Sequence, residues 1–99
     1  MTASRRALPV PDEVARDASA VELVRVWASG RRQHVSLMAD AWADPAAWGI
    51  MLVDLARHVS RAIATVQHTD PDQTLGRIRA GFDAEWSHHT DKPIGDVRQ

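Results

Sequence analysis

The sequence predicts an α+β fold, in which a β-hairpin is followed by one long helix and a second, shorter helix. Two runs rich in Val and other apolar residues, at 21–28 and 33–38, alternate in polarity and flank Gly30, as in a hairpin. The segment 44–67 instead repeats apolar residues at spacings of three and four, which is typical of an amphipathic helix. A second segment with helical spacing follows Asp70.

Length and composition set the broad class. The 99 residues suffice for one domain, and 44% hydrophobic with 25% charged residues is ordinary for a soluble globular protein. No apolar run is long enough to cross a bilayer, and no apolar segment follows Arg5 and Arg6 to make a secretory leader. With no cysteine, the chain has no disulfide, thiolate or Cys-based zinc site. We expect a bacterial, cytoplasmic protein with no membrane contact.

The charge pattern argues against nucleic-acid binding. Net charge is −1, and neither half of the chain carries the basic excess that drives phosphate binding. Arg31 and Arg32, at the hairpin tip, are expected to be solvated rather than to bind phosphate.

Three regions are expected along the chain: an N-terminal arm (1–20), a single α+β domain (21–87) and a flexible C-terminal tail (88–99). Pro9 and Pro11 favour an extended path in the arm, and residues 12–18 could form a short helix. Pro93 and Gly95 break the polar tail.

The alternation of the hairpin assigns its two faces. A type II′ turn centred on Gly30 and Arg31 puts the four residues of the first face opposite one another in pairs. A Ser29-Gly30 turn would keep the same faces. We expect the first face to pack on the long helix. Its pairs are Val26 with Val35 and Val24 with Leu37.

The second face of the hairpin is half apolar and needs a cover, because a two-stranded sheet is not stable alone. Either the N-terminal arm or another subunit could supply it. We predict a homodimer that buries Leu23, Trp27 and Met38. His34 shares this face, either filling a half-buried surface or acting as a ligand or proton-sensing residue at a subunit contact.

Asp44 and Pro45 mark the start of the long helix. An Asp side chain can accept a hydrogen bond from a backbone N–H of the first turn, and Pro loses nothing by lacking an N–H at that position. Trp42, just before it, is expected to fold back onto the core. The predicted core stripe of this helix consists of Trp48, Met51, Leu52, Leu55, Val59, Ala62, Ile63 and Val66.

Asp70 and Pro71 mark the second helix start, with Gln73 at capping-box spacing. Gly81 could allow close approach to another helix. The predicted core stripe of this helix consists of Leu75, Ile78, Phe82 and Trp86.

Four segments have a distinctive sequence: ELVRVW at 22–27, HVSL at 34–37, DPAAWGIMLVDLARHV at 44–59 and RIRAGFDAEW at 77–86. Together they resemble a family of small bacterial proteins, domain of unknown function 5076. The resemblance spans residues 18–90 and implies a self-standing small protein. It implies no activity and no catalytic residues.

Few residues suggest chemistry. Asp54 and His58 lie four apart on the long helix, where a carboxylate can orient an imidazole, but we favour an ordinary structural pair over a catalytic one. His88, His89 and Asp91 have metal-ligand side chains but no partner set at defined spacing, so we expect neither a specific metal site nor a cofactor.

We therefore favour a non-enzymatic homodimeric interaction or assembly module with an unknown protein partner. The alternative is a small-ligand-binding protein or enzyme that uses Asp54 and His58.

Overall fold

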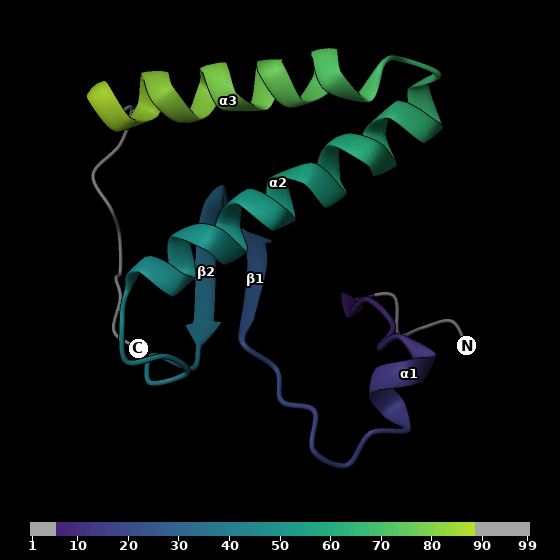
Figure 1. The fold of residues 1–99 in the computed structure, drawn as a ribbon, viewed down its shortest axis with the longest axis vertical. Helices are drawn as coiled ribbons and strands as arrows, with labels where there is room; N and C mark the ends of the chain where they lie inside the picture. Colours follow the sequence, from purple (N-terminus) through teal and green to yellow (C-terminus); the bar gives the residue numbers. More distant parts are fainter. Residues whose placement is uncertain (1–5, 89–99) are drawn as a thin grey trace.

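The computed structural model describes residues 6–88, and its elements confirm the predicted α+β class. A hairpin and two helices follow a one-turn helix in the N-terminal arm (Figure 1). In chain order these are α1 (Asp12–Ala15), β1 (Val24–Ser29), β2 (Arg32–Leu37), α2 (Ala46–Gln67) and α3 (Pro71–Ser87).

The hairpin has the predicted register. Val26 pairs with Val35 and Val24 pairs with Leu37 in an antiparallel ladder. The predicted turn type is wrong. Gly30 and Arg31 have φ values of 61° and 65°, and positive φ at both central residues defines a type I′ turn rather than type II′. Both turns have two residues and a twist that suits the strands, so the register is the same for either.

Helices α2 and α3 pack through small side chains. Because α2 approaches no other element, its buried residues, Ser60 and Ala64, lie in the contact with α3. Ala56, one turn before Ser60, is half-buried. Ser60 Oγ donates a hydrogen bond of 2.8 Å to the carbonyl oxygen of Arg57, so its burial leaves no unsatisfied hydroxyl. On the α2 side, the helices touch along a row of residues that apolar periodicity did not select.

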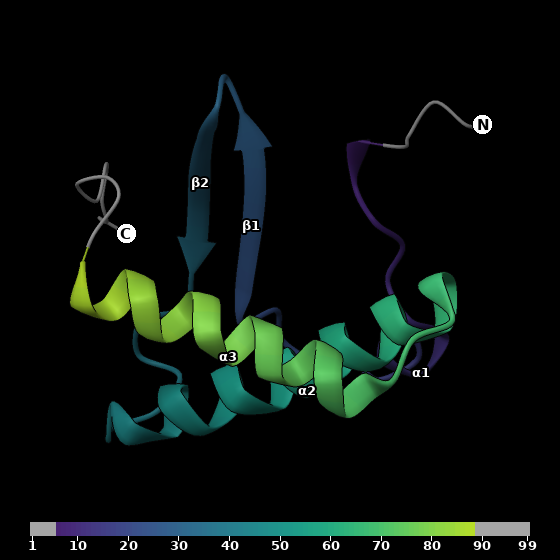
Figure 2. The same ribbon diagram turned by 90° about the horizontal axis from the view of Figure 1, so that it is seen from above.

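The hairpin does not pack on the long helix, so that expectation is wrong. Between elements, Cα atoms come within 8 Å only for β1 with β2 and for α2 with α3. Figure 2 shows the hairpin extending away from the helices, with its turn farthest from them. Hydrogen bonds hold the exit of the hairpin, since Met38 N donates to Leu23 O and Ala41 N donates to Met38 O. The short linker to α2 is thus fixed in a direction that carries the hairpin away from its own helix.

Most of the predicted stripe of α2 is consequently exposed. Trp48, Met51 and Ile63 are half-buried. Trp42 folds back into an edge-to-face contact with Trp48 at 5.1 Å between ring centroids, but it stays exposed. The leucines and valines of the stripe are exposed. We call these residues the open face of α2: Leu52, Leu55, Val59 and Val66.

The predicted stripe of α3 is covered only in its first half. Leu75 and Ile78 are half-buried, whereas Phe82 and Trp86 are exposed and stack on each other at 5.6 Å. In Figure 1 the two helices diverge from the turn that joins them, which leaves the end of α3 away from α2. The expected close approach at Gly81 is wrong for the same reason, since a Cβ there would meet no atom within 4 Å.

Two sequence predictions fall on residues outside the described range. The flexible tail lies there except for His88, as do His89 and Asp91 of the histidine cluster. No helix in residues 6–88 combines the length and hydrophobicity needed to cross a membrane.

Candidate functional site

The predicted interface residues all lie on the second face of the hairpin. Leu23 and Met38 stand together at its base, where Met38 N donates to Leu23 O at 2.9 Å, and Trp27 pairs with His34 nearer the turn. Leu23, Trp27 and Met38 are half-buried and line a hollow of about 650 Å³, whereas His34 is exposed. His34 Nε2 lies 3.3 Å from the carbonyl oxygen of Ser29, within hydrogen-bond distance.

Arg25 is the charged centre of this face. Its Nε donates to Glu22 at 2.8 Å, and its guanidinium lies 5.8 Å from the centre of the Trp27 ring. The hydrogen bond from Arg25 to Glu22, reinforced by the carboxylate charge, raises the pKa of Arg25 above its ordinary value. Arg25 therefore lies over the Trp27 ring with its charge already paired, so both side chains can be buried together in an interface.

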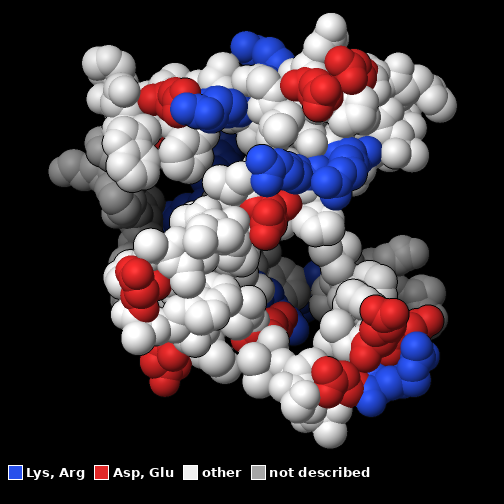
Figure 3. Space-filling model, in the orientation of Figure 1, with Lys and Arg blue, Asp and Glu red and all other residues white. Residues whose placement is uncertain are grey.

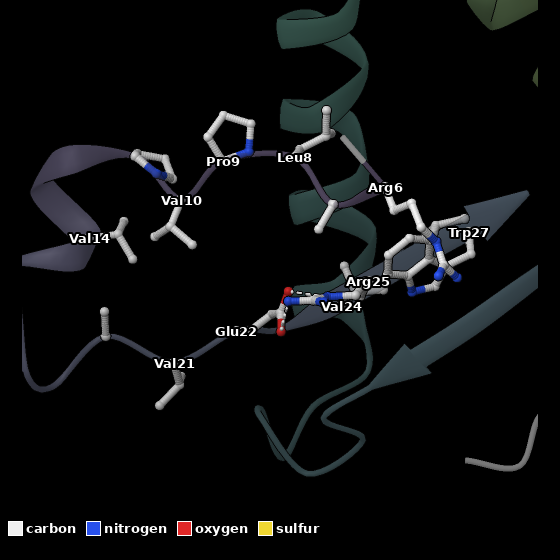
Figure 4. A pocket seen from close by; sticks show the side chains of 14 residues that line it. Arg6, Leu8, Pro9, Val10, Val14, Val21, Glu22, Val24, Arg25 and Trp27 are labelled. Carbon is white, nitrogen blue, oxygen red and sulfur yellow. Dashed lines mark hydrogen bonds and ion pairs between the residues drawn. The ribbon is translucent and has the colours of Figure 1, made fainter. Parts of the chain in front are cut away.

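The N-terminal arm borders a second hollow, of about 460 Å³, shared with the start of β1 (Figure 4). In Figure 4 the arm from Arg6 to Val14 runs opposite the segment from Val21 to Trp27. Leu8, in the middle of this arm, is 90% exposed. The arm therefore lies beside the sheet without burying its own apolar side chains on it.

Sequence reasoning identified two apolar surfaces but wrongly paired them with each other within one chain. The first face of the hairpin, formed by Val24, Val26, Val35 and Leu37, has no helix against it. The open face of α2 has no hairpin against it. Apolar alternation and helical periodicity identified both surfaces, but neither pattern says which chain supplies the cover.

Among the described residues, no hydrogen bond or ion pair joins Asp54 to His58. Asp54 Oδ1 lies 3.8 Å from Arg57 Nη1, and His58 is exposed. Neither hollow described above includes them. Within residues 6–88, no three His, Cys, Asp or Glu side chains gather as a metal site would require. The two residues stay a prediction without a surrounding pocket.

Charges of both signs alternate over the face shown in Figure 3. Arginine and acidic side chains lie next to one another there, and no continuous basic stripe crosses this face. Several of these charges are paired along the helices, such as Arg79 with Asp83 at 3.1 Å. The apolar surfaces are therefore the most distinctive feature of the described molecule.

Comparison with known proteins identifies the family. A family model described as domain of unknown function 5076 matches residues 7–90. The chain belongs to this family. The match confirms the resemblance seen in the sequence and extends it into the N-terminal arm.

One solved structure is similar over the full length of both chains. It comes from the photosynthetic bacterium Rhodopseudomonas palustrus CGA009 and is provisionally named a pyruvate dehydrogenase. The two chains are 33% identical, the match covers 100% of each, and the TM-score is 0.72. No curated protein matches this member of the family.

Proposed function

We propose that the protein is a non-enzymatic interaction module that works as a homodimer. The observation that carries the proposal is the open face of α2, a row of aliphatic side chains on a well-formed helix that residues 6–88 leave uncovered. Such a face is costly in water and typical of a surface that another protein covers.

The described residues bury little apolar surface within one copy, which supports the same conclusion. Only Ala64 among the described apolar residues is buried. At about 25 cal/mol per Å² of apolar surface removed from water, association of two copies supplies the burial that one copy lacks.

The predicted patch of Leu23, Trp27, His34 and Met38 remains part of this proposal. Leu23, Trp27 and Met38 line one hollow, and Arg25 beside them is already paired with Glu22. Aromatic and arginine side chains with satisfied charges are common at the centres of interfaces.

The provisional name of the similar structure suggests an enzyme instead, and the described residues favour that reading less. Asp54, which the sequence pairs with His58, lies beside Arg57 instead, and neither hollow is lined by Asp54 or His58. We therefore keep the enzyme with Asp54 and His58 as the alternative. Pyruvate-dependent turnover by the purified protein, lost in both Asp54→Asn and His58→Ala variants, would establish it.

The predicted organisation and location complete the proposal. We assign an arm at 1–20, a domain at 21–87 and a tail at 88–99, supported by the distance of α1 from every other described element. Limited proteolysis should then cut first in the arm or the tail. A cytoplasmic location rests on the cysteine-free composition.

Native mass spectrometry of the untagged protein tests the dimer. We expect a species of twice the 10.9 kDa chain mass. A monomer at micromolar concentration would overturn the proposal. The Trp27→Ala variant tests the patch, because a folded dimer of unchanged affinity would remove Trp27 and its neighbours from the interface.

A further inference from the structure

We infer that the two copies exchange hairpins: the first face of the hairpin of one copy covers the open face of α2 of the other. This inference rests on the proposed homodimer and goes beyond it by naming the two surfaces that meet. They are Val24, Val26, Val35 and Leu37 on the hairpin and Leu52, Leu55, Val59 and Val66 on α2.

The hairpin is long enough to lie along the open face of α2. A strand of six residues spans about 20 Å at 3.3–3.4 Å per residue, and the open face, from Leu52 to Val66, spans about 21 Å at 1.5 Å per residue. The two apolar pairs occupy about 7 Å of the strand at the base of the hairpin, so they meet one part of the open face. A twofold axis repeats the same contact on the other side.

The first face of the hairpin and the open face of α2 match in chemistry. Every side chain named on both surfaces is Val or Leu, so contact between them buries no charge and leaves no polar group unpaired. The charged residues of α2 lie elsewhere around the helix: by helical projection Asp54, Arg57 and Arg61 fall on a different side from Leu55 and Val59.

Exchange satisfies both unpartnered surfaces at once, which is why we prefer it to a pairing of two α2 helices. A helix–helix dimer would cover the open faces but leave the hairpins alone in water, where a two-stranded sheet is unstable. Apolar residues occur on both faces of β1, as in a strand that is covered on each side. The first face would meet the partner helix, and the second face carries the patch of Leu23, Trp27 and Met38.

The hairpin is already placed for exchange. It extends away from its own helices (Figure 2), and the hydrogen bonds at Met38 and Ala41 fix the direction in which it leaves.

Disulfide cross-linking between singly substituted chains tests the exchange directly, because the natural sequence has no cysteine. One preparation carries Val35→Cys, and a second carries Leu52→Cys, Leu55→Cys or Val59→Cys. Each is first shown to be a dimer by native mass spectrometry while reduced. The preparations are then mixed, allowed to exchange subunits and oxidised.

We expect a covalent heterodimer that contains one chain of each kind, in greater yield than the covalent homodimer that either preparation forms alone. The matched control replaces Leu55→Cys with Arg61→Cys on the charged side of α2, and it should give no such species. Cross-linking no stronger than in this control, with the dimer intact, would overturn the exchange and leave the homodimer standing. Absence of the dimer itself would overturn both.

A chain that carries Val35→Cys and Leu55→Cys together separates exchange from packing within one copy. Exchange predicts a product of twice the chain mass under denaturing, non-reducing conditions. A closed loop of single-chain mass would show that the hairpin folds onto its own helix, and the inference would be wrong.

Discussion

At the scale of single residues, two aspartates decide where the main helices begin. Asp44 Oδ1 accepts a hydrogen bond from Ala46 N at 3.0 Å, and Asp70 Oδ1 accepts one from Asp72 N at 3.3 Å. A proline follows each aspartate, where a missing N–H costs nothing. The starts of both helices were therefore predictable from local chemistry, to within two residues for α2.

Replacing Asp70 should destabilise the protein through α3. Asp70→Ala removes the side-chain acceptor at the start of the helix, and loss of such a cap costs about 1 kcal/mol in the free energy of unfolding. Urea unfolding followed by circular dichroism measures this. Asp70→Asn is the matched control, since it keeps an acceptor and should retain most of the stability. Equal losses in the two variants would show that the carboxylate charge, rather than the hydrogen bond, acts at this position.

Asp17 provides a test of local electrostatics. Its carboxylate accepts hydrogen bonds from the Ser19 hydroxyl at 2.6 Å and from the Ser19 backbone N–H at 2.9 Å, and these bonds lower the pKa of Asp17 below its ordinary value. The turn is thus favoured above the ordinary pKa, and this contribution is lost as pH falls through the lowered one. Ser19→Ala removes the larger cause, so an NMR titration should show the pKa of Asp17 rising. A pKa unchanged by the substitution would contradict the role of the hydroxyl.

At the scale of elements, α2 presents three different sides. Small residues face α3, aliphatic residues form the open face, and charged residues occupy the rest. Apolar periodicity predicted the second side because Leu and Val dominate any hydrophobic pattern. It missed the first because Ser and Ala carry little hydrophobic signal, although their spacing of four is the spacing of closely packed helices.

Enlarging a small residue in the α2–α3 contact should be damaging. Ala64 is 6% exposed, so Ala64→Leu forces the helices apart and is expected to cost about 1–3 kcal/mol in the free energy of unfolding. Ala80→Leu on the exposed side of α3 is the control and should cost far less. Thermal unfolding of both variants checks this, and equal melting temperatures would show that the helices are not in close contact at Ala64.

The hairpin turn contains one residue in an unfavourable conformation. Arg31 has a φ of 65°, which costs a non-glycine residue about 1–2 kcal/mol. Arg31→Gly should therefore stabilise the protein by about 0.5–1 kcal/mol after the greater backbone entropy of glycine is subtracted. Arg32→Gly, in the neighbouring strand position, should instead destabilise it. Urea unfolding of the two variants should give shifts of opposite sign, and shifts of the same sign would contradict the type I′ turn.

At the scale of the whole molecule, the described elements form three separate parts, α1, the hairpin and the helical pair, and no contact joins the hairpin to the helical pair within residues 6–88. In the proposed homodimer the partner supplies that contact. Folding and association are then one event, as in obligate dimers that have no stable monomer.

The melting temperature should accordingly depend on protein concentration. Because dissociation accompanies unfolding, dilution favours the unfolded chains and should lower the melting temperature. Circular dichroism melts over a hundredfold range of concentration measure this. The Leu55→Asp variant, which puts a charge on the open face, should lose the dimer. A melting temperature independent of concentration would indicate a monomer that is stable alone.

Local sequence patterns were enough to determine the elements of this protein. Alternation set the faces and register of the hairpin, Asp-Pro pairs set the helix starts, and helical spacing identified the apolar stripe of α2, because each depends on residues close together in the chain. Only the tertiary structure decided how the elements meet. An apolar pattern indicates that a face must be covered, but it does not identify the element that covers it. The sequence therefore could not show that the hairpin leaves its own helix or that Ser60 and Ala64 form the contact with α3.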